Sequence, residues 1–311
     1  MSNALNGPVR LRCGGYQGEA SVHTRGLRAF AAALATANAD VAVEITPNVT
    51  ASGHPAAALP GLVESGTLEL CYFNSSYLAT RVPALRALDL PFLLTDRTRA
   101  YALLDGALGR HLTAAVEAAT RFRLLAFWDN GFRHLTNRVR PIRAPRDCAG
   151  LRLRTVDSPL HQEIFRALGF EPVVIDVKDL PDAVASGRVD AQENPLTNTV
   201  NFNLHRTHRH ISLTAHFFGV VLVLANRARF DGWPVATRDT IRTALAAATA
   251  AQRGYATDED TVCLTRLTTD GCSVLGPDAV DLSAFDQAVA AIRRRETAAL
   301  DPQIVAALGA V

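Results

Sequence analysis

Short apolar runs alternate along the chain with longer segments in which apolar residues recur every three or four positions. The short runs are typical of β-strands and cover residues 9–13, 41–46, 68–73, 124–128, 134–138, 151–155, 172–175, 189–192 and 220–225. The longer segments predict helices at 21–36, 55–65, 99–119, 158–168, 178–186, 196–205, 237–256, 259–268 and 283–300. Strands that alternate with helices predict an α/β protein whose parallel or mixed sheets are covered by helices.

Residues 150–195 carry the most informative polar pattern. In 151–155 the alternation places Leu151, Leu153 and Thr155 on one strand face and Arg152 and Arg154 on the other. A second short strand, at 189–192, is followed by the amide of Asn194 and by a proline that can begin a helix. An arginine and an asparagine at strand ends, facing one cleft, would suit a carboxylate ligand.

Composition limits the alternatives. A chain of 311 residues is long enough for two domains, each with its own core. The formal net charge of +2 argues against a dedicated nucleic-acid binder. The sequence contains no run of about 18 apolar residues, so it predicts no membrane-spanning helix. Motifs of hydrolases, zinc proteases, P-loop proteins and dinucleotide-binding proteins are absent, so we expect no enzyme activity.

Histidines and cysteines give weaker signals. His205, His208 and His210 have a spacing that could supply metal ligands, but interleaved arginines would repel a cation, and a solvated helix end is the better interpretation. We therefore expect neither a metal nor a cofactor. The five cysteines lack C-x-x-C spacing; Cys263 and Cys272 are close enough in sequence for a disulfide to be possible.

Four segments, in order, resemble the DctP-type substrate receptors of TRAP transporters. They are GYQGEASVHTRGLRAFAAAL, ESGTLELCYFNSSYLATRVPALRALDLPF, WDNGFRHLTNRVRPIRAPRDCAGLRLRT and ALGFEPVVIDVKDLPDAVASGRVDAQENPL. The resemblance implies a type II periplasmic-binding-protein fold, in which two discontinuous α/β lobes are joined by a hinge and enclose a ligand cleft. Lobe I would comprise 1–130 plus 219–258, and lobe II 131–218 plus 259–311. Pro181 and Ala191 depart from the family pattern, where an aromatic residue and a glycine are common.

The resemblance also assigns the carboxylate-binding side chains. Arg154 would pair with the ligand carboxylate, because a guanidinium offers two parallel donors at carboxylate spacing. Arg133 would be a second cleft arginine, with a structural salt bridge near the hinge as the alternative. Asn194 would donate to the same carboxylate, with a helix cap before the following proline as the alternative. The alternative for Arg154 is a surface arginine on an exposed strand face.

Ligand selectivity would come from the opposite wall. Asn74 stands where the family varies its polar selector, and Ser75 would add a hydroxyl contact unless it only forms a turn. Tyr16 and His23 lie in the loop and helix start after the first strand, where helix N-termini favour anions. Phe217 would line the pocket, although adjacent phenylalanines more often belong to a core.

The resemblance implies an extracytoplasmic receptor that binds a small organic acid and delivers it to the membrane permease subunits of a TRAP transporter. We expect a hydroxy- or keto-monocarboxylate, with aromatic and sugar-derived acids included, and a monomeric receptor in the periplasm. Residues 1–8 lack a basic start and an apolar core, so they give no export signal, which we attribute to removal or to a misassigned start. The competing interpretation is an unexported sensor with the same fold that reports an organic acid to a partner protein.

Overall fold

One mixed β-sheet extends through the whole molecule, in a computed structural model that describes residues 9–37 and 39–309. The strand order is β2-β1-β3-β8-β4-β7-β5-β6, and β9 pairs with β8. The strands are β1 (Val9–Gly14), β2 (Val41–Thr46), β3 (Leu70–Asn74), β4 (Phe122–Asn137), β5 (Arg152–Thr155), β6 (Glu171–Val174), β7 (Ala191–Pro195), β8 (His210–Asn226) and β9 (Ser273–Leu275). The predicted signal-free amino terminus, 1–8, lies outside the described residues.

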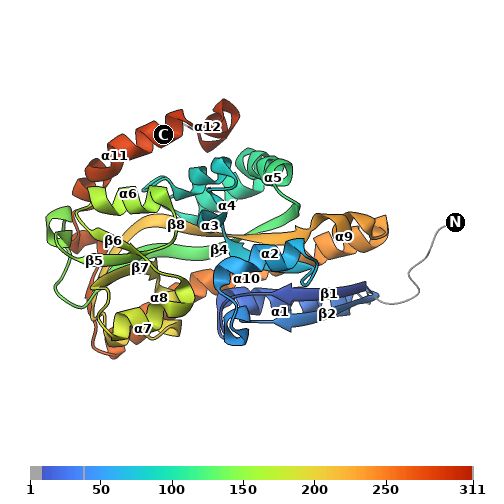
Figure 1. Cartoon of the computed structure of the whole chain (residues 1–311), viewed down its shortest axis with the longest axis horizontal. Coiled ribbons are helices and arrows are strands. Elements are labelled where there is room, and N and C mark those ends of the chain that lie inside the picture. Colours follow the sequence, from blue (N-terminus) through green and yellow to red (C-terminus); the bar gives the residue numbers. More distant parts are fainter. Residues whose placement is uncertain (1–8, 38, 310–311) are drawn as a thin grey trace.

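Helices lie on both sides of this sheet (Figure 1), as the α/β pattern predicts. They are α1 (Val22–Thr36), α2 (Leu59–Glu64), α3 (Ser75–Leu78), α4 (Arg97–Asp105), α5 (Ala107–Ala119), α6 (Pro159–Ala167), α7 (Leu180–Ala185), α8 (Leu196–Asn201), α9 (Arg227–Gly232), α10 (Val235–Thr269), α11 (Leu282–Ala298) and α12 (Pro302–Leu308). Capping fixes several starts: the Ser158 hydroxyl accepts from the His161 amide at the start of α6, and Pro159 occupies its first turn.

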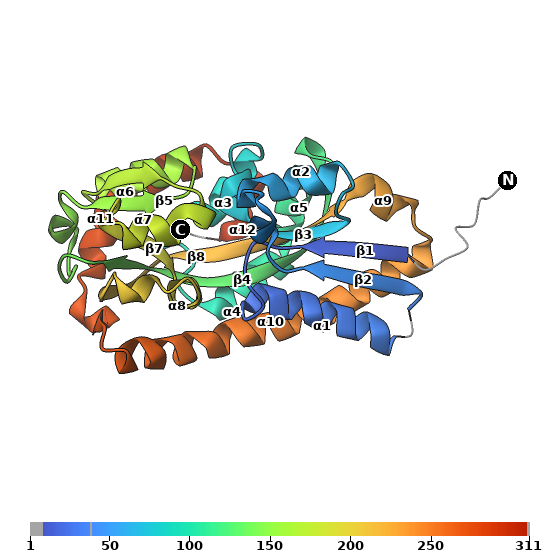
Figure 2. The ribbon, with the colours of Figure 1, turned by 60° about the horizontal axis from the view of Figure 1, so that its bottom comes forward.

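The two central strands, β4 and β8, cross from one lobe to the other (Figure 2). Lobe I is built on β2, β1 and β3, and lobe II on β7, β5 and β6. The first half of β4 pairs with β8 alone, whereas its second half, from Arg133 on, also pairs with β7. Our prediction of separate strands at 124–128 and 134–138 is wrong, because a bulge at Asp129–Gly131 bends one strand of 16 residues instead of ending it.

Gly131 makes this crossing possible. Its φ of +91° favours glycine, and a Cβ there would come within 3.0 Å of the Pro195 Cβ. The register of β4 therefore changes between Asp129 and Gly131, opposite Gly219 of β8. The predicted lobe boundaries at 130/131 and 218/219 fall at this point, and the exact division of the chain stays a prediction.

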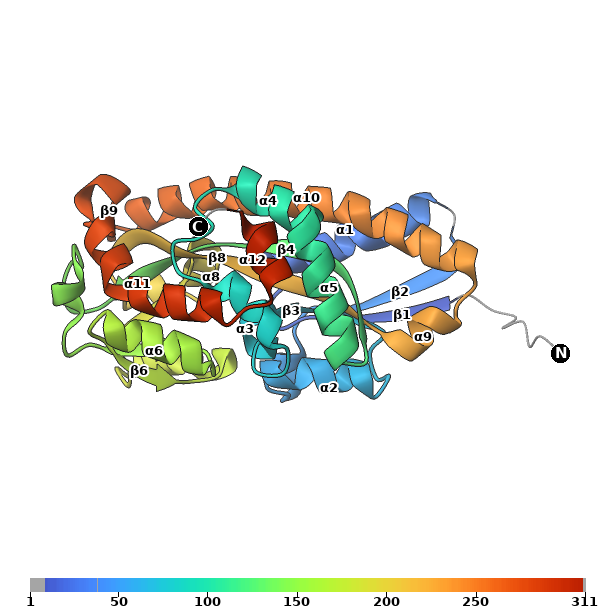
Figure 3. The ribbon, with the colours of Figure 1, turned by 90° about the horizontal axis from the view of Figure 1, so that it is seen from above.

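The predicted helices at 237–256 and 259–268 are one helix, α10, of 35 residues, which extends along both lobes (Figures 2 and 3). Two acidic residues at the expected break have partners: Glu259 pairs with Arg25 and Asp260 with Arg97. The Thr257 hydroxyl bonds to the Arg253 carbonyl inside the helix. Conversely, the predicted helix at 99–119 is two helices, because the backbone leaves the helical region at Gly106.

Separate hydrophobic cores stabilise the lobes, and side chains join them. Val177, which follows β6 of lobe II, packs into the core of lobe I. On another side, α11 packs against α6 of lobe II and α12 against α5 of lobe I (Figure 3). The lobes are therefore in contact in this structure. All five cysteines are buried free thiols, so the possible Cys263–Cys272 disulfide is not formed.

Candidate functional site

Arg154 lies at the carboxyl end of β5, between the parallel strands β6 and β7. Its side chain is buried, with 1% of the residue exposed, so the surface-arginine alternative is wrong. The Nε atom donates to the Ile175 carbonyl at 2.8 Å, whereas Nη2 is buried and has no hydrogen-bond partner among the described residues. A buried guanidinium with a free donor is costly unless a bound group satisfies it.

Arg133 forms a buried ion pair with Glu193 of the neighbouring strand β7. Its Nη2 donates to Glu193 Oε1 at 2.7 Å and to the Glu193 carbonyl at 2.9 Å. Burial disfavours both charges, but their attraction prevails, so the pKa of Glu193 lies well below its usual range and that of Arg133 above it. The salt-bridge alternative for Arg133 is thus present in the structure, and it neutralises most of this charge.

Asn194 follows Glu193 and belongs to a buried chain of amides. Its Nδ2 donates to Gln192 Oε1 at 2.6 Å, and its Oδ1 accepts from Asn198 Nδ2 at 3.2 Å. It does not cap α8, which begins without a side-chain cap, so the capping alternative is wrong. Asn198 also accepts from Gln17 of lobe I at 3.2 Å, so the chain of amides continues across the cleft.

Tyr16 brings lobe I to the two arginines. Burial raises the pKa of its phenol well above the usual value, while the charges of Arg133 and Arg154 act to lower it. Tyr77 of α3 acts on the pKa values of both Tyr16 and Arg133. The two phenols of lobe I therefore lie within electrostatic range of the basic side chains of lobe II. Tyr77 was missed from the sequence, where it stands beside the polar selector motif.

Asn74 and Ser75 lie together at the junction of β3 and α3. The Asn74 side chain caps α3 by accepting from the Ser76 amide at 2.9 Å, and both predicted residues are buried. The next hydroxyl along, Ser76, donates to Asp89 Oδ1 at 2.7 Å, and Asp89, also of lobe I, lies 3.2 Å from His161 of lobe II. The turn-forming role and a cleft position are thus compatible for this segment.

His23 and Phe217 are buried beside this group and make other contacts. The His23 ring is fully buried, and its Nε2 lies 2.8 Å from Asn130 Oδ1; burial lowers its pKa to about 4. His23 therefore contacts the crossing strand, and its ring also packs against Tyr72 of β3 at 5.0 Å between centroids. Phe217 belongs to the core of lobe II, where its ring stacks on His161 at 4.7 Å between centroids.

A buried contact between the lobes was missed from the sequence. His161 Nε2 of α6 lies 3.2 Å from Asp89 Oδ1, in a pair that is almost fully buried. The atoms are close but poorly aligned, and Asp89 Oδ2 and His161 Nδ1 have no hydrogen-bond partner among the described residues. The two residues are 72 positions apart, so no local pattern could join them.

His205 and His208 are buried, so the predicted solvated helix end is wrong. His205 lies 3.1 Å from Asp270, and His208 lies 3.2 Å from the Thr136 hydroxyl. Within 9–37 and 39–309, no group of three acidic, histidine or cysteine side chains could hold a metal ion.

A cavity of about 450 Å³ lies between the lobes. Lobe I contributes α2 and the β3–α3 junction, and lobe II contributes the ends of β5 and β6. The residues that line the cavity include Phe73, Tyr77, Leu78, Val174, Ile175 and Asp176. Ile175 links this cavity to Arg154: it lines the cavity, and its carbonyl accepts from Arg154 Nε, although Arg154 itself does not line the cavity.

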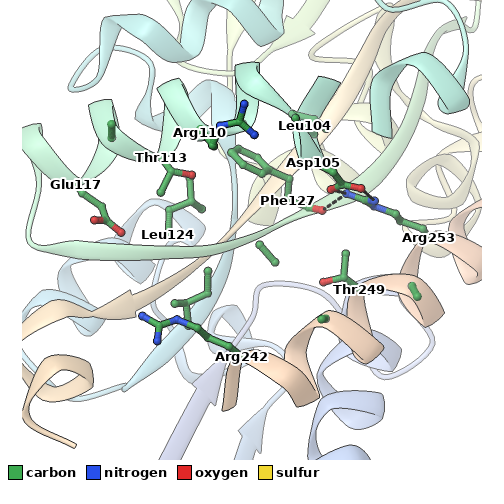
Figure 4. Close-up of a pocket in the computed structure, with 17 residues that line it drawn as sticks. Leu104, Asp105, Arg110, Thr113, Glu117, Leu124, Phe127, Arg242, Thr249 and Arg253 are labelled. Carbon is green, nitrogen blue, oxygen red and sulfur yellow. Dashed lines mark hydrogen bonds and ion pairs between the residues drawn. The ribbon is translucent and has the colours of Figure 1, made fainter. Parts of the chain in front are cut away.

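A larger groove of about 710 Å³ lies elsewhere, between α5 and α10 with β4 as its floor (Figure 4). Arg253 borders it and is paired with Asp105 through two hydrogen bonds of 2.7 and 2.8 Å. The groove belongs to lobe I alone, and unlike the interlobe cavity it is not lined by Ile175, whose carbonyl accepts from Arg154. We therefore place the candidate site between the lobes.

Two α/β lobes around an interlobe site, connected by crossing strands, define the class of periplasmic solute-binding proteins. The chain belongs to the bacterial extracellular solute-binding protein family 7, the DctP family, which residues 13–298 match. The expected family is thereby confirmed, and it is a family of solute-binding proteins, not of enzymes. No helix within the described residues is long and apolar enough to cross a bilayer.

Individual relatives agree with this assignment. The chain is 31% identical over 230 residues to a solute-binding protein of Verminephrobacter eiseniae, covering 74% of this chain and 68% of the relative. It is 33% identical over 180 residues to the 2,3-diketo-L-gulonate-binding periplasmic protein YiaO of Escherichia coli, covering 58% and 54%. A TRAP periplasmic solute-binding protein of Polaromonas, solved with D-erythronate, superposes with a TM-score of 0.90 at 28% identity, covering 97% and 99%. The expected two-lobe fold is confirmed.

Proposed function

We propose that the protein is the extracytoplasmic receptor of a TRAP transporter and binds a small organic monocarboxylate between its lobes. One observation carries the proposal: Arg154 is buried at a strand end with a free Nη2 donor. A carboxylate at this position would satisfy the donor and compensate the charge. Each such charge-assisted hydrogen bond contributes about 1.5–3 kcal/mol.

The charges around the site favour a ligand with one carboxylate. Glu193 compensates Arg133, so Arg154 supplies the remaining positive charge among the basic residues discussed. The facing wall of lobe I offers uncharged groups, namely Tyr16, Gln17, Asn74, Ser75 and Tyr77. A second carboxylate would meet no free cation on that wall, whereas hydroxyl or keto oxygens would meet amides and phenols.

Two relatives favour a hydroxy- or keto-acid ligand derived from a sugar, and we keep aromatic acids in the proposed ligand class. One relative is named for 2,3-diketo-L-gulonate, and one similar structure was solved with D-erythronate. Other relatives are named as C4-dicarboxylate-binding proteins, so a dicarboxylate is the competing ligand class. Membership of an extracellular solute-binding family favours a periplasmic receptor over an unexported sensor. We further propose that the receptor is a monomer that delivers its ligand to the permease subunits.

A thermal-shift screen tests the proposal. The panel would contain hydroxy and keto monocarboxylates, the dicarboxylate succinate, and the amide or ester of each acid. A ligand that binds the native state raises the melting temperature, by an amount set by its concentration relative to Kd. We expect shifts with monocarboxylates that disappear with the neutral analogues and in Arg154→Ala. Equal shifts by acids and amides, or a stronger shift with succinate, would contradict the proposed ligand class.

A further inference from the structure

The interlobe cavity lies next to Ile175, whose carbonyl accepts from Arg154. Its volume of about 450 Å³ falls within the range of roughly 300–1,000 Å³ that is typical of pockets for drug-sized ligands. Arg154 does not line this cavity, so a three- or four-carbon acid bound to its guanidinium would leave the cavity unfilled. The lining of the remaining space therefore bears on the rest of the ligand.

This lining is mainly apolar and aromatic. The rings of Phe73 and Tyr77 lie 5.3 Å apart at an interplanar angle of 30°, and Phe73 meets Tyr16 edge-on at 6.4 Å. Val174 and Ile175 form the facing wall from lobe II, and Leu78 adds a further aliphatic surface. Aromatic rings and branched aliphatic groups are the substituents that such walls accommodate best.

The charged groups at this cavity disfavour a second acid. Asp157 and Asp176 line it from lobe II. Arg81 lines it from lobe I, but its guanidinium is paired with Glu64. A carboxylate placed here would therefore face two acidic side chains and an arginine that is already compensated, so the second end of the ligand is expected to be uncharged.

The cavity and the proposed carboxylate anchor share a residue. The Ile175 carbonyl accepts from Arg154 Nε at 2.8 Å, and the same residue lines the cavity. Tyr77 likewise lines the cavity and lies within electrostatic range of Arg133. A short ligand could therefore place its carboxylate at Arg154 and a substituent against the rings.

We propose that the interlobe cavity receives the apolar tail, aromatic or branched, of a 2-hydroxy monocarboxylate whose head binds at Arg154. This inference rests on the proposed carboxylate-receptor function and narrows its substrate class. Both lobes contribute to the cavity, so the tail would contact the two lobes together and stabilise their closed arrangement.

Calorimetric titration with lactate, 3-phenyllactate and malate tests the inference, because the three acids share a 2-hydroxy carboxylate head and differ in the tail. Filling a hydrophobic pocket by even one methylene changes affinity by about tenfold or more, so wild-type protein should bind phenyllactate at least about tenfold more tightly than lactate. Malate, with a carboxylate in place of the ring, should bind more weakly than phenyllactate.

A variant whose side chain fills the cavity tests whether the ligand tail binds there. Val174 is 40% exposed, so Val174→Trp should fold while its indole occupies the cavity. It should lower phenyllactate affinity at least about tenfold and lactate affinity less than about twofold. The matched control is Val139→Trp, a valine that is 48% exposed and outside the cavity, which should change neither.

Three results would overturn the inference. Equal wild-type affinity for lactate and phenyllactate would exclude a tail pocket. An equal loss of affinity for both acids in Val174→Trp would exclude it too. Either result would leave the proposal of a carboxylate receptor intact. Failure of wild-type protein to bind any of the three acids, together with no monocarboxylate shift in the thermal screen, would refute the receptor proposal itself.

Discussion

Replacement of Arg154 by lysine gives the sharpest test of the carboxylate anchor. Lysine keeps the positive charge but loses the forked geometry, so its single ammonium cannot replace both the Nε bond to Ile175 and the free Nη2 donor. At least one charge-assisted hydrogen bond to the ligand should be lost. At about 1.5–3 kcal/mol per bond, and 1.4 kcal/mol per tenfold change, Kd should rise roughly 10- to 140-fold.

The ligand-free protein should be affected much less. The variant loses one neutral-acceptor hydrogen bond at the Ile175 carbonyl, worth about 1 kcal/mol, which corresponds to no more than about 4 °C in the melting temperature. Isothermal titration calorimetry would give Kd, and calorimetric scanning of the ligand-free protein would give Tm. Both measurements are needed, because loss of a ligand anchor raises Kd, whereas loss of a structural arginine lowers the Tm of the ligand-free protein.

Arg152→Lys is the matched control. Arg152 lies two residues earlier on the same strand, is half-exposed, and is paired with Asp190 at 2.8 Å. It should therefore retain wild-type affinity. A Kd for Arg154→Lys within about threefold of wild type would refute the anchor. A fall in ligand-free Tm of more than about 10 °C would assign Arg154 a structural role instead.

Three further changes test other parts of the site. Asn194→Ala should weaken ligand binding and cost about 1 kcal/mol of folding stability, because its bond to Gln192 is also lost; denaturant titration and calorimetry separate the two effects, and a loss of stability alone would remove Asn194 from the binding site. Asn74→Ser should keep the α3 cap while changing which acids bind, as read from the thermal-shift panel, and a uniform loss across acids would contradict a selector role. Glu193→Gln should cost about 3–5 kcal/mol at neutral pH, because it leaves Arg133 buried and unpaired. Since the folded pKa of Glu193 is depressed, its stabilisation is present above its unfolded pKa of about 4.3 and is lost as pH falls below it, so the variant should show a flatter acid limb in Tm against pH than wild type.

Local signals predicted most elements, whereas long-range pairing decided the others. The start of α6 follows from Ser158 and Pro159, which act on their own neighbours. The continuity of α10 could not be predicted, because Arg25 and Arg97, the partners of its acidic residues, are more than 160 positions away. The same holds for β4, whose bulge is held between two strands that local patterns do not identify as its neighbours.

The candidate site likewise contains residues that local sequence signals predict and residues whose contacts depend on long-range pairing. The position of Arg154 at a strand end followed from alternation and family resemblance, and its burial agrees with that expectation. The pairing of Arg133 with Glu193 depends on the register between β4 and β7, 60 residues apart, and so it stayed one of two alternatives. His23 and Phe217 were named from their sequence neighbourhood, but the packing of the crossing strand and of the lobe II core determines their contacts.

We expect the two crossing strands to act as a flexure: this part of the sheet would bend when the lobes move, but it would not stretch. Hydrogen bonds along β4 and β8 hold the lobes at a fixed separation where the strands pass Gly131 and Gly219. Any tilt of one lobe against the other must then grow with distance from that line. Spectroscopic labels on Ala57 and Val174, on opposite sides of the interlobe cavity, should report the largest change in separation when ligand binds. Labels next to the crossing should report almost none.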